Sequence, residues 1–206
     1  MTSRKKLADQ ANAVHEAGHT VSMWSEALLL GVKKVTIIRD PERGSLGATT
    51  PRYRRWLTSL SSRQLLRARI RFYLAGRIAE ELCLGEPFVG SSDDLENATE
   101  LAMVLVAQEG MHDGVRLVCL GKTAGSEHAK KLVDKAVQAV LDECYREEKK
   151  RLTPRKQEIM KVAFALTERK TLKRRDLKKL LGKRPEHLVP MRVLKRRPKN
   201  VKARRK

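Results

Sequence analysis

Apolar side chains recur every three or four positions along most of the chain, which is the spacing of helices that bury one face. The pattern predicts a first helix over residues 3–30, with Gly31 as its end signal. Longer helices are predicted over residues 62–84, 94–109 and 126–150. Pro154 in a first turn starts a helix over residues 153–168, and Thr171 is predicted to cap a last short helix that Gly182 ends.

Residues 32–40, VKKVTIIRD, interrupt this helical period. Their β-branched side chains predict a short strand. Residues 41–51 are rich in Gly, Pro and Ser and predict a turn and loop, in which residues 46–49 can return as a second strand. The predicted fold class is therefore mainly α (α+β), a helical domain with a small β element near its first helix.

Composition sets the broad class of the protein. The chain has 206 residues, 41% of them hydrophobic, enough for the core of one large domain or two small ones. No run of 18 or more apolar residues occurs, so no membrane span is predicted. The N-terminus lacks the apolar stretch of a signal peptide, and the expected location is the cytoplasm. Cys83, Cys119 and Cys144 form no Cys-x-x-Cys pair and are predicted to be reduced, packed thiols.

The net charge of +21 is concentrated near the C-terminus. Residues 183–206 contain eleven Lys or Arg and one acid, Glu186, and therefore carry about half of the excess. Such a segment cannot bury much and is predicted to be disordered. It is either a solubilising end or a contact for nucleic acid, an anionic membrane surface or an acidic partner. It has no aromatic residue to stack on bases, so any nucleic-acid binding would be mainly electrostatic.

The segment AVHEAGHTV, residues 13–21, carries the candidate chemistry. His15 and His19 lie about one helical turn apart and can offer their imidazoles to one metal ion. Glu16 points beside that ion, where a carboxylate can take a proton from water and pass it to a leaving amine. The alternative is an ordinary helix whose histidines are solvated or hydrogen bonded in the core. Small apolar neighbours, and the metal-ligand spacing of two of the five histidines, favour the site.

A catalytic zinc ion (Zn2+) needs three protein ligands and one open position, so a third ligand must lie elsewhere. Histidine and acid candidates remain open at this point: His112, His128, His187, Asp93, Asp94, Glu80 and Glu81. The most suggestive group is GSSDDLENAT, residues 90–99, which places Asp93 and Asp94 at the start of a helix. A carboxylate there can equally be an N-cap, and the residue types alone do not choose between the two aspartates.

Several motifs, in order, resemble the peptidase domain of the FtsH-type membrane-bound AAA+ zinc proteases. They are HEAGH at 15–19, KVTII at 34–38, LG at 46–47, LAGRIAEEL at 74–82, DDLENAT at 93–99 and EGM at 109–111. LDECYREEKKRLT and ALTERKTL resemble the end of that domain, so the resemblance covers roughly residues 13–181. It implies a helical zinc-metallopeptidase domain over residues 1–182, followed by a basic tail over 183–206.

The resemblance also implies the roles of particular residues. His15, His19 and Asp94 match the family's three zinc ligands, and Glu16 matches its catalytic glutamate. Glu80 matches a glutamate better suited to orienting a histidine than to binding the metal. Residues 34–39 match an edge strand with which an extended protein or peptide substrate can pair, backbone to backbone. Family peptidase domains form six-membered rings, which makes a hexamer the expected homo-oligomer.

The chain also departs from that family. It has no Gly-x-x-x-x-Gly-Lys-Ser/Thr stretch and is not expected to hydrolyse ATP. The segments RDPERG, at 39–44, and PRYRRWLTSLSS, at 51–62, differ from the family pattern. Two hypotheses follow. The first is a zinc-dependent metalloendopeptidase that cleaves unfolded or flexible proteins and is served by a separate ATPase or unfoldase. The second is a non-cleaving binding or regulatory module whose basic tail contacts nucleic acid or an anionic surface.

Overall fold

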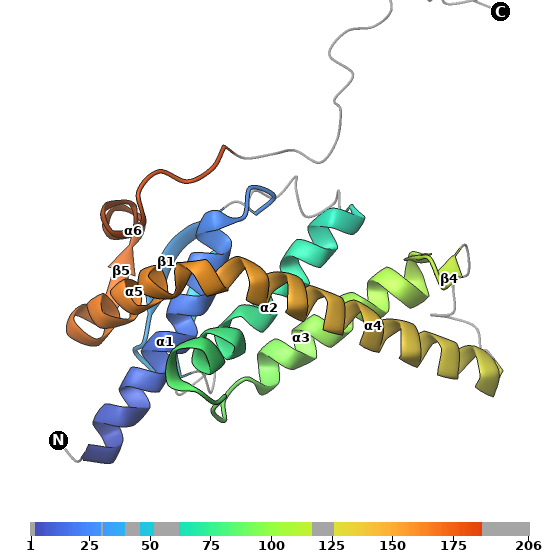
Figure 1. Ribbon diagram of the computed structural model, residues 1–206, viewed down its shortest axis with the longest axis horizontal. Coiled ribbons are helices and arrows are strands. Elements are labelled where there is room, and N and C mark those ends of the chain that lie inside the picture. Colours follow the sequence, from blue (N-terminus) through green and yellow to red (C-terminus); the bar gives the residue numbers. More distant parts are fainter. Residues whose placement is uncertain (1–2, 30, 40–45, 52–61, 117–125, 187–206) are drawn as a thin grey trace, which may run out of the picture.

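The computed structural model describes residues 3–29, 31–39, 46–51, 62–116 and 126–186. Its helices run in the order α1 Ser3–Ser25, α2 Arg63–Leu84, α3 Ser92–Met103, α4 Glu127–Leu152, α5 Lys156–Arg169 and α6 Arg174–Leu181. A π-helical turn, η2 Val104–Gln108, extends α3, and a 3-10 turn, η3 Thr153–Arg155, joins α4 to α5. Figure 1 shows α1 and α2 crossing behind α4 and α5.

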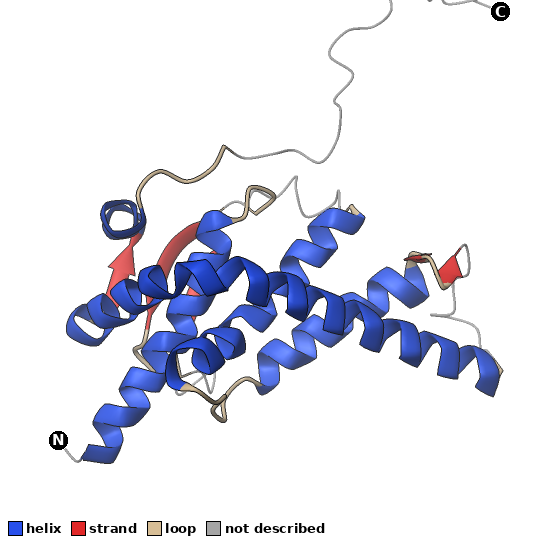
Figure 2. Cartoon of the chain, in the orientation of Figure 1, coloured by secondary structure: helices blue, strands red, loops and turns tan. Residues whose placement is uncertain are grey.

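The strands form one small sheet and one hairpin. In the sheet, β1 Val32–Thr36 lies between β2 Ala48–Pro51 and β5 Thr171–Lys173, and both pairings are antiparallel. The hairpin joins β3 Met111–His112 to β4 Val115–Arg116. Figure 2 shows a mostly helical chain with the sheet at one side, in contact with α1. The predicted mainly α (α+β) fold class is confirmed.

Local capping explains where the long helices begin and end. The hydroxyls of Ser62 and Ser126 accept hydrogen bonds from the third backbone N–H of α2 and α4, both at 3.2 Å. These bonds satisfy amides that have no partner inside the helix. Gly85, with φ of +94°, ends α2 in the left-handed conformation that glycine adopts readily. The predicted starts at residues 62 and 126 and the end at residue 84 are therefore confirmed to within one residue.

The helix that carries the histidines lies unusually close to α2. A Cβ atom on Gly18 would lie 2.5 Å from both the Ala75 carbonyl oxygen and the Ala79 Cβ atom. Glycine at this position lets α1 and α2 approach backbone to backbone, and α5 packs against another side of α1. No helix among the described residues is long and apolar enough to cross a membrane.

Three predicted elements were wrong in their extent or place. The first helix ends at Ser25, not near residue 30. Thr171 begins β5 and caps no helix; α6 starts after Lys173, whose backbone N–H donates to Asp176 at 2.8 Å. Because β5 pairs with β1, the strand predicted over residues 34–39 is central and not an edge strand. Among the described residues β2 pairs only with β1, so β2 is the edge strand that borders the candidate site.

The chain stays attached to the domain as far as residue 184. The Arg184 guanidinium donates hydrogen bonds to the backbone carbonyls of Trp24 at 2.9 Å, Glu26 at 2.6 Å and Leu29 at 2.8 Å. It thus satisfies carbonyls at and just beyond the C-terminus of α1. Cys119 and residues 187–206 lie outside the described residues. The domain division at residue 182, the disordered tail and the cytoplasmic location stay predictions, while Cys83 and Cys144 are free thiols.

Candidate metal centre

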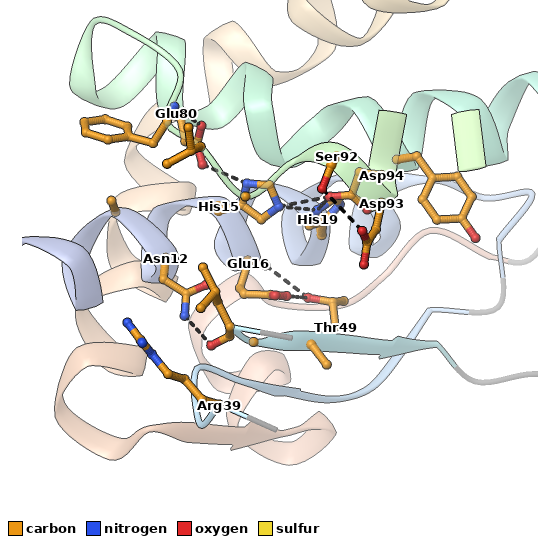
Figure 3. Close-up of a pocket in the computed structure, with 18 of the residues that line it drawn as sticks. Asn12, His15, Glu16, His19, Arg39, Thr49, Glu80, Ser92, Asp93 and Asp94 are labelled. Carbon is orange, nitrogen blue, oxygen red and sulfur yellow. Dashed lines mark hydrogen bonds and ion pairs between the residues drawn. The ribbon is translucent and has the colours of Figure 1, made fainter. Parts of the chain in front are cut away.

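One turn of α1 presents both histidines to α2 and to the first turn of α3. The Nε2 atoms of His15 and His19 lie 3.0 Å apart, and each lies 3.0 Å from Oδ2 of Asp94. Among the described residues, these three side chains are the one group of His, Cys, Asp or Glu whose ligand atoms converge closely enough to hold a metal ion. Figure 3 shows them pointing toward one another from the two helices.

The other nitrogen of each imidazole is held by a residue of α2. His19 Nδ1 lies 2.8 Å from the Phe72 carbonyl oxygen, which can only accept a hydrogen bond, so Nδ1 is the donor. His15 Nδ1 lies 2.8 Å from Oε1 of Glu80, and Oε2 of Glu80 accepts the Phe88 backbone N–H at 2.8 Å. In the neutral histidines both Nε2 atoms are therefore left as acceptors, which is the arrangement found around metal-ligating histidines.

The three converging atoms fit a cation. Two Nε2 lone pairs and a carboxylate oxygen, mutually 3.0 Å apart, cannot satisfy one another without a positive charge between them. Two histidines and one carboxylate form a donor set of catalytic zinc sites, and it leaves a fourth position open. Space is kept by Gly76 of α2, because a Cβ there would lie 2.5 Å from His15 Cε1 and 2.6 Å from His19 Nε2.

The electrostatics of the centre also favour positive charge. Burial lowers the pKa of His15, but hydrogen bonds and charge from Asp94 and Glu80 outweigh it and raise that pKa to about 10. Burial raises the pKa of Asp94, yet the charge of His19 and hydrogen bonds from both imidazoles bring it well below its usual range. The site thus holds a carboxylate ready for a cation, and a metal ion would replace the proton on His15.

Glu16 lies on the side of α1 that faces the sheet. Its side chain is buried, and burial raises its pKa, partly opposed by the charge of His19 and by a hydrogen bond from Thr49. The Thr49 hydroxyl donates to Oε2 of Glu16 at 2.7 Å. On the other side, a Cβ on Gly47 would lie 2.8 Å from Oε1 of Glu16. The carboxylate is therefore confined between two residues of the chain that forms β2, as Figure 3 shows for Thr49.

A cavity of about 680 Å³ opens in front of these groups. One wall is the start of β2 with the residues before it, and another is the loop that leads into α3. Three side chains at this cavity are exposed and apolar: Leu46, Phe88 and Val89, the last 99% exposed. Asn12 donates to the Leu46 carbonyl oxygen at 2.6 Å and so fixes the approach to β2. The cavity joins an apolar rim to a polar floor formed by the histidines, Glu16 and Asp94.

The remaining candidates for a third ligand are engaged elsewhere or fall outside the group. Asp93 accepts a hydrogen bond from Ser92, and Glu81 binds Tyr145 and Lys149 on α4. The Nδ1 atom of His112 accepts the Gly114 backbone N–H. Neither His112 nor His128 belongs to the converging group, and His187 lies outside the described residues.

Reasoning from sequence missed Thr49, Phe72 and Gly76. A hydroxyl residue just after the Leu46-Gly47 pair was a usable signal for Thr49. Phe72 contributes only its carbonyl oxygen, so its side-chain type carried no signal. Gly76 stands in the middle of a helix, where glycine costs about 1 kcal/mol relative to alanine, and that cost was a usable signal for a close approach.

A His-Glu-x-x-His helix completed by an aspartate from a second helix defines a candidate centre of the zinc-peptidase class. Comparison with protein families then identifies the group. Residues 2–180 match the family model described as Peptidase family M41. Because this match spans most of the chain, the chain belongs to that family.

Curated relatives carry matching names. An ATP-dependent zinc metalloprotease FtsH 2 of Symbiobacterium thermophilum is 33% identical over 82% of this chain and 30% of its own length. An ATP-dependent zinc metalloprotease FtsH of Corynebacterium glutamicum is 32% identical over 89% of the chain and 22% of its own length. The mitochondrial inner membrane m-AAA protease component AFG3L2 of Mus musculus is 31% identical over 84% of the chain and 22% of its own length. The chain thus spans less than a third of the length of these relatives.

Proposed function

We propose that this protein is a zinc-dependent metalloendopeptidase that hydrolyses peptide bonds in unfolded or flexible proteins. The observation that carries the proposal is the convergence of His15, His19 and Asp94, with ligand atoms 3.0 Å apart and Glu16 beside them. Membership of the M41 peptidase family and relatives named zinc metalloproteases support the same activity.

In this proposal His15, His19 and Asp94 hold the metal. A zinc ion bound there would supply Lewis-acid activation of water and of the peptide carbonyl group. Glu16 accepts the proton of the attacking water and then passes it to the leaving amine. Its raised pKa suits the first step, because a carboxylate with a higher pKa is a stronger base and takes up the proton of water more readily. The carboxyl group then holds that proton until the leaving amine accepts it. Thr49 keeps the carboxylate turned toward the cavity.

The substrate is proposed to bind as an extended chain along β2. This strand pairs on one side with β1, and it borders the cavity with its residues Ala48, Thr49 and Pro51. Backbone pairing along such an edge is indifferent to side-chain identity, which suits a peptidase of unfolded chains. The exposed rim of Leu46, Phe88 and Val89 adds a preference for apolar side chains next to the cleaved bond.

Two partners follow from this proposal. The relatives named above are called ATP-dependent, and they are much longer than this chain. We infer that folded substrates need a separate ATPase or unfoldase, whereas an already unfolded chain does not. A homo-oligomer, a hexamer in the ring-forming family that the sequence resembles, is the second proposed partnership.

The experiment compares the full chain with its Glu16→Gln variant. Zinc per chain is measured by elemental analysis, and hydrolysis is followed on an unfolded protein and on the same protein folded. The proposal expects about one zinc ion per chain in both proteins, and a loss of hydrolysis in Glu16→Gln of at least about a hundredfold. A chain without zinc, or Glu16→Gln with undiminished hydrolysis, would show the proposal to be wrong.

The non-cleaving module is the second hypothesis, and a specific observation weighs against it. A binding module has no need of a buried, general-base glutamate. Here Glu16 is only 6% exposed and is held by both Thr49 and the close approach of Gly47. Zinc binding without hydrolysis of any unfolded protein would favour the module.

A further inference from the structure

Like charges face each other on the outer face of the sheet. Lys34 of β1 stands directly opposite Lys173 of β5, and both side chains are exposed. The next pair along, Val35 and Leu172, is fully buried on the other face. Like charges directly opposite in an antiparallel pair destabilise the sheet, so the lysine pair needs a reason other than stability.

The positive charge continues onto α6, which directly follows β5 (Figure 1). Arg174 and Lys178 are exposed one turn apart, and so are Arg175 and Lys179. Such i, i+4 repulsion destabilises a helix, and the two arginines at its N-terminus also oppose the helix dipole. We call these residues the cationic surface: Lys33, Lys34, Lys173, Arg174, Arg175, Lys178 and Lys179.

Within the three described elements that carry this surface, β1, β5 and α6, Asp176 is the only acid. None of the surface's seven side chains forms an ion pair with a described residue; Arg174 instead lies over the Trp24 ring, 5.7 Å from its centroid. Asp176, the one acid of α6, pairs with Arg169 of α5 at 2.9 Å. Seven cations without an ion pair, beside one acid that already pairs with Arg169, are an electrostatic footprint for a polyanion.

The surroundings favour nucleic acid over a membrane. A basic helix that enters a bilayer does so with its apolar face. In α6 that face is already used, because Leu177 is fully buried and Leu180 and Leu181 pack against the core. Beside the lysine pair, the residues on this face of the sheet include the threonines Thr36, Thr50 and Thr171. We propose that the cationic surface binds the phosphate backbone of nucleic acid without reading its sequence.

The position of the surface separates it from the peptidase cavity. The cavity borders β2, whereas five of the seven residues lie on β5 and α6, at the opposite edge of the sheet; Lys33 and Lys34 lie on β1, between them. The edge of β2 proposed to bind substrate faces away from β1, so nucleic acid bound across β1, β5 and α6 leaves that edge open, and the proposal does not depend on hydrolysis. The next residues in the sequence, 183–206, add ten net positive charges to the same end of the chain. Binding through the cationic surface would hold this protein on nucleic acid, beside other proteins bound to the same nucleic acid.

Binding is tested with the full chain carrying Glu16→Gln, so that no self-cleavage interferes. Its affinity for a fluorescent DNA duplex of about 20 base pairs is measured between about 50 and 200 mM KCl. Replacing Lys34, Lys173, Lys178 and Lys179 by Gln should weaken binding at least tenfold and reduce the salt slope by about three to four. A matched control replaces Lys131, Lys135, Lys156 and Lys161 by Gln, which removes the same charge elsewhere. It should change binding less than about threefold.

Other outcomes overturn the proposal. Equal losses in the two fourfold variants would assign binding to net charge and not to this surface. A chain ending at Glu186 should keep weaker, salt-dependent binding that the surface variant abolishes; no binding by that shortened chain would assign the contact to the tail alone. Binding to vesicles of anionic phospholipid or to polyglutamate at lower concentration than to DNA would identify a different partner. Failure of hydrolysis in the unmodified chain would leave the expected DNA results unchanged.

Discussion

The hydroxyl group of Thr49 lies 2.7 Å from Oε2 of Glu16 and donates a hydrogen bond to it. Glu16 belongs to α1, the helix of the two histidines, whereas Thr49 belongs to β2, the strand beside the cavity. One hydrogen bond therefore joins the proposed general base to the proposed substrate-binding strand. In the proposed mechanism the same contact sets proton transfer and substrate alignment, which gives Thr49 the role of a positioning residue.

Replacing Thr49 by Val removes that donor at nearly constant volume. We expect kcat to fall about tenfold, the effect of one hydrogen bond of about 1.4 kcal/mol, with KM nearly unchanged. The pKa of Glu16 should rise further once the donor is lost, so the acid limb of the pH–rate profile should move to higher pH. Thr49→Ser, which keeps the hydroxyl, should restore kcat, and zinc content should be the same in all three proteins. A Val variant with the kcat of the unmodified chain would exclude the role.

Asp94→Ala should remove one proposed metal ligand and leave two imidazoles facing each other. Zinc affinity, measured by competition with a chelator, should fall more than about a hundredfold, since even residues beyond the ligands affect it by about ten- to a hundredfold. Asp93→Ala is the matched control at the neighbouring position, because Asp93 lies outside the converging group. Equal affinities in the two variants would contradict the assignment of Asp94.

Glu80 and Glu81 provide a second matched pair. Oε1 of Glu80 lies 2.8 Å from His15 Nδ1 and forms a hydrogen bond with it. The Glu81 carboxylate instead accepts hydrogen bonds from Lys149, at 3.1 Å, and from Tyr145, both on α4. Glu80→Gln should weaken zinc binding by about ten- to a hundredfold through the orientation and basicity of His15. Glu81→Gln should leave zinc binding unchanged and alter only thermal stability. The reverse order of the two effects would show that His15 is not oriented from Glu80.

Gly76→Ala tests whether the helix keeps space for the metal. An alanine Cβ would lie 2.5 Å from His15 Cε1, so the imidazoles must shift and zinc binding should be lost. Alanine also favours a helix over glycine by about 1 kcal/mol, so the metal-free protein should remain folded. Circular dichroism with zinc analysis separates the two effects; a folded variant that binds zinc normally would refute the spatial argument.

Arg184→Met should destabilise the fold without touching the centre. The substitution leaves the carbonyls of Trp24, Glu26 and Leu29 without their donor, which should cost about 1–3 kcal/mol in the free energy of unfolding. Lys183→Met, at the exposed neighbouring position, is the control and should change little. Urea unfolding followed by fluorescence measures both, and equal stabilities would mean that Arg184 does not hold the end of α1.

Local signals in the sequence determined most of the helices and, within the candidate site, the two histidines of α1. The spacing of apolar residues, the capping serines at 62 and 126 and Gly85 act within one or two turns, so the sequence alone predicted the extent of α2 and α4. The His-Glu-x-x-His spacing is equally local, since helical period alone brings His15 and His19 to one side. Residue types could not choose between Asp93 and Asp94, or between Glu80 and Glu81; only the resemblance favoured one of each.

Tertiary contacts decided what depends on distance across the chain. Asp94 is 79 residues from His15, and its selection over Asp93 follows from how the first turn of α3 meets α1. β5 becomes a strand because Thr171, Leu172 and Lys173 find β1 as a partner, and this pairing turns an expected edge strand into a central one. The sequence alone determined the pair of histidines that the helix brings together and the neighbouring glutamate proposed as the base. Among the aspartates that residue types left open, the tertiary structure shows which carboxylate converges on the histidines, in agreement with the family resemblance. Packing alone decided the strand that holds Glu16 and the edge left for a substrate, because both depend on contacts between segments far apart in the chain.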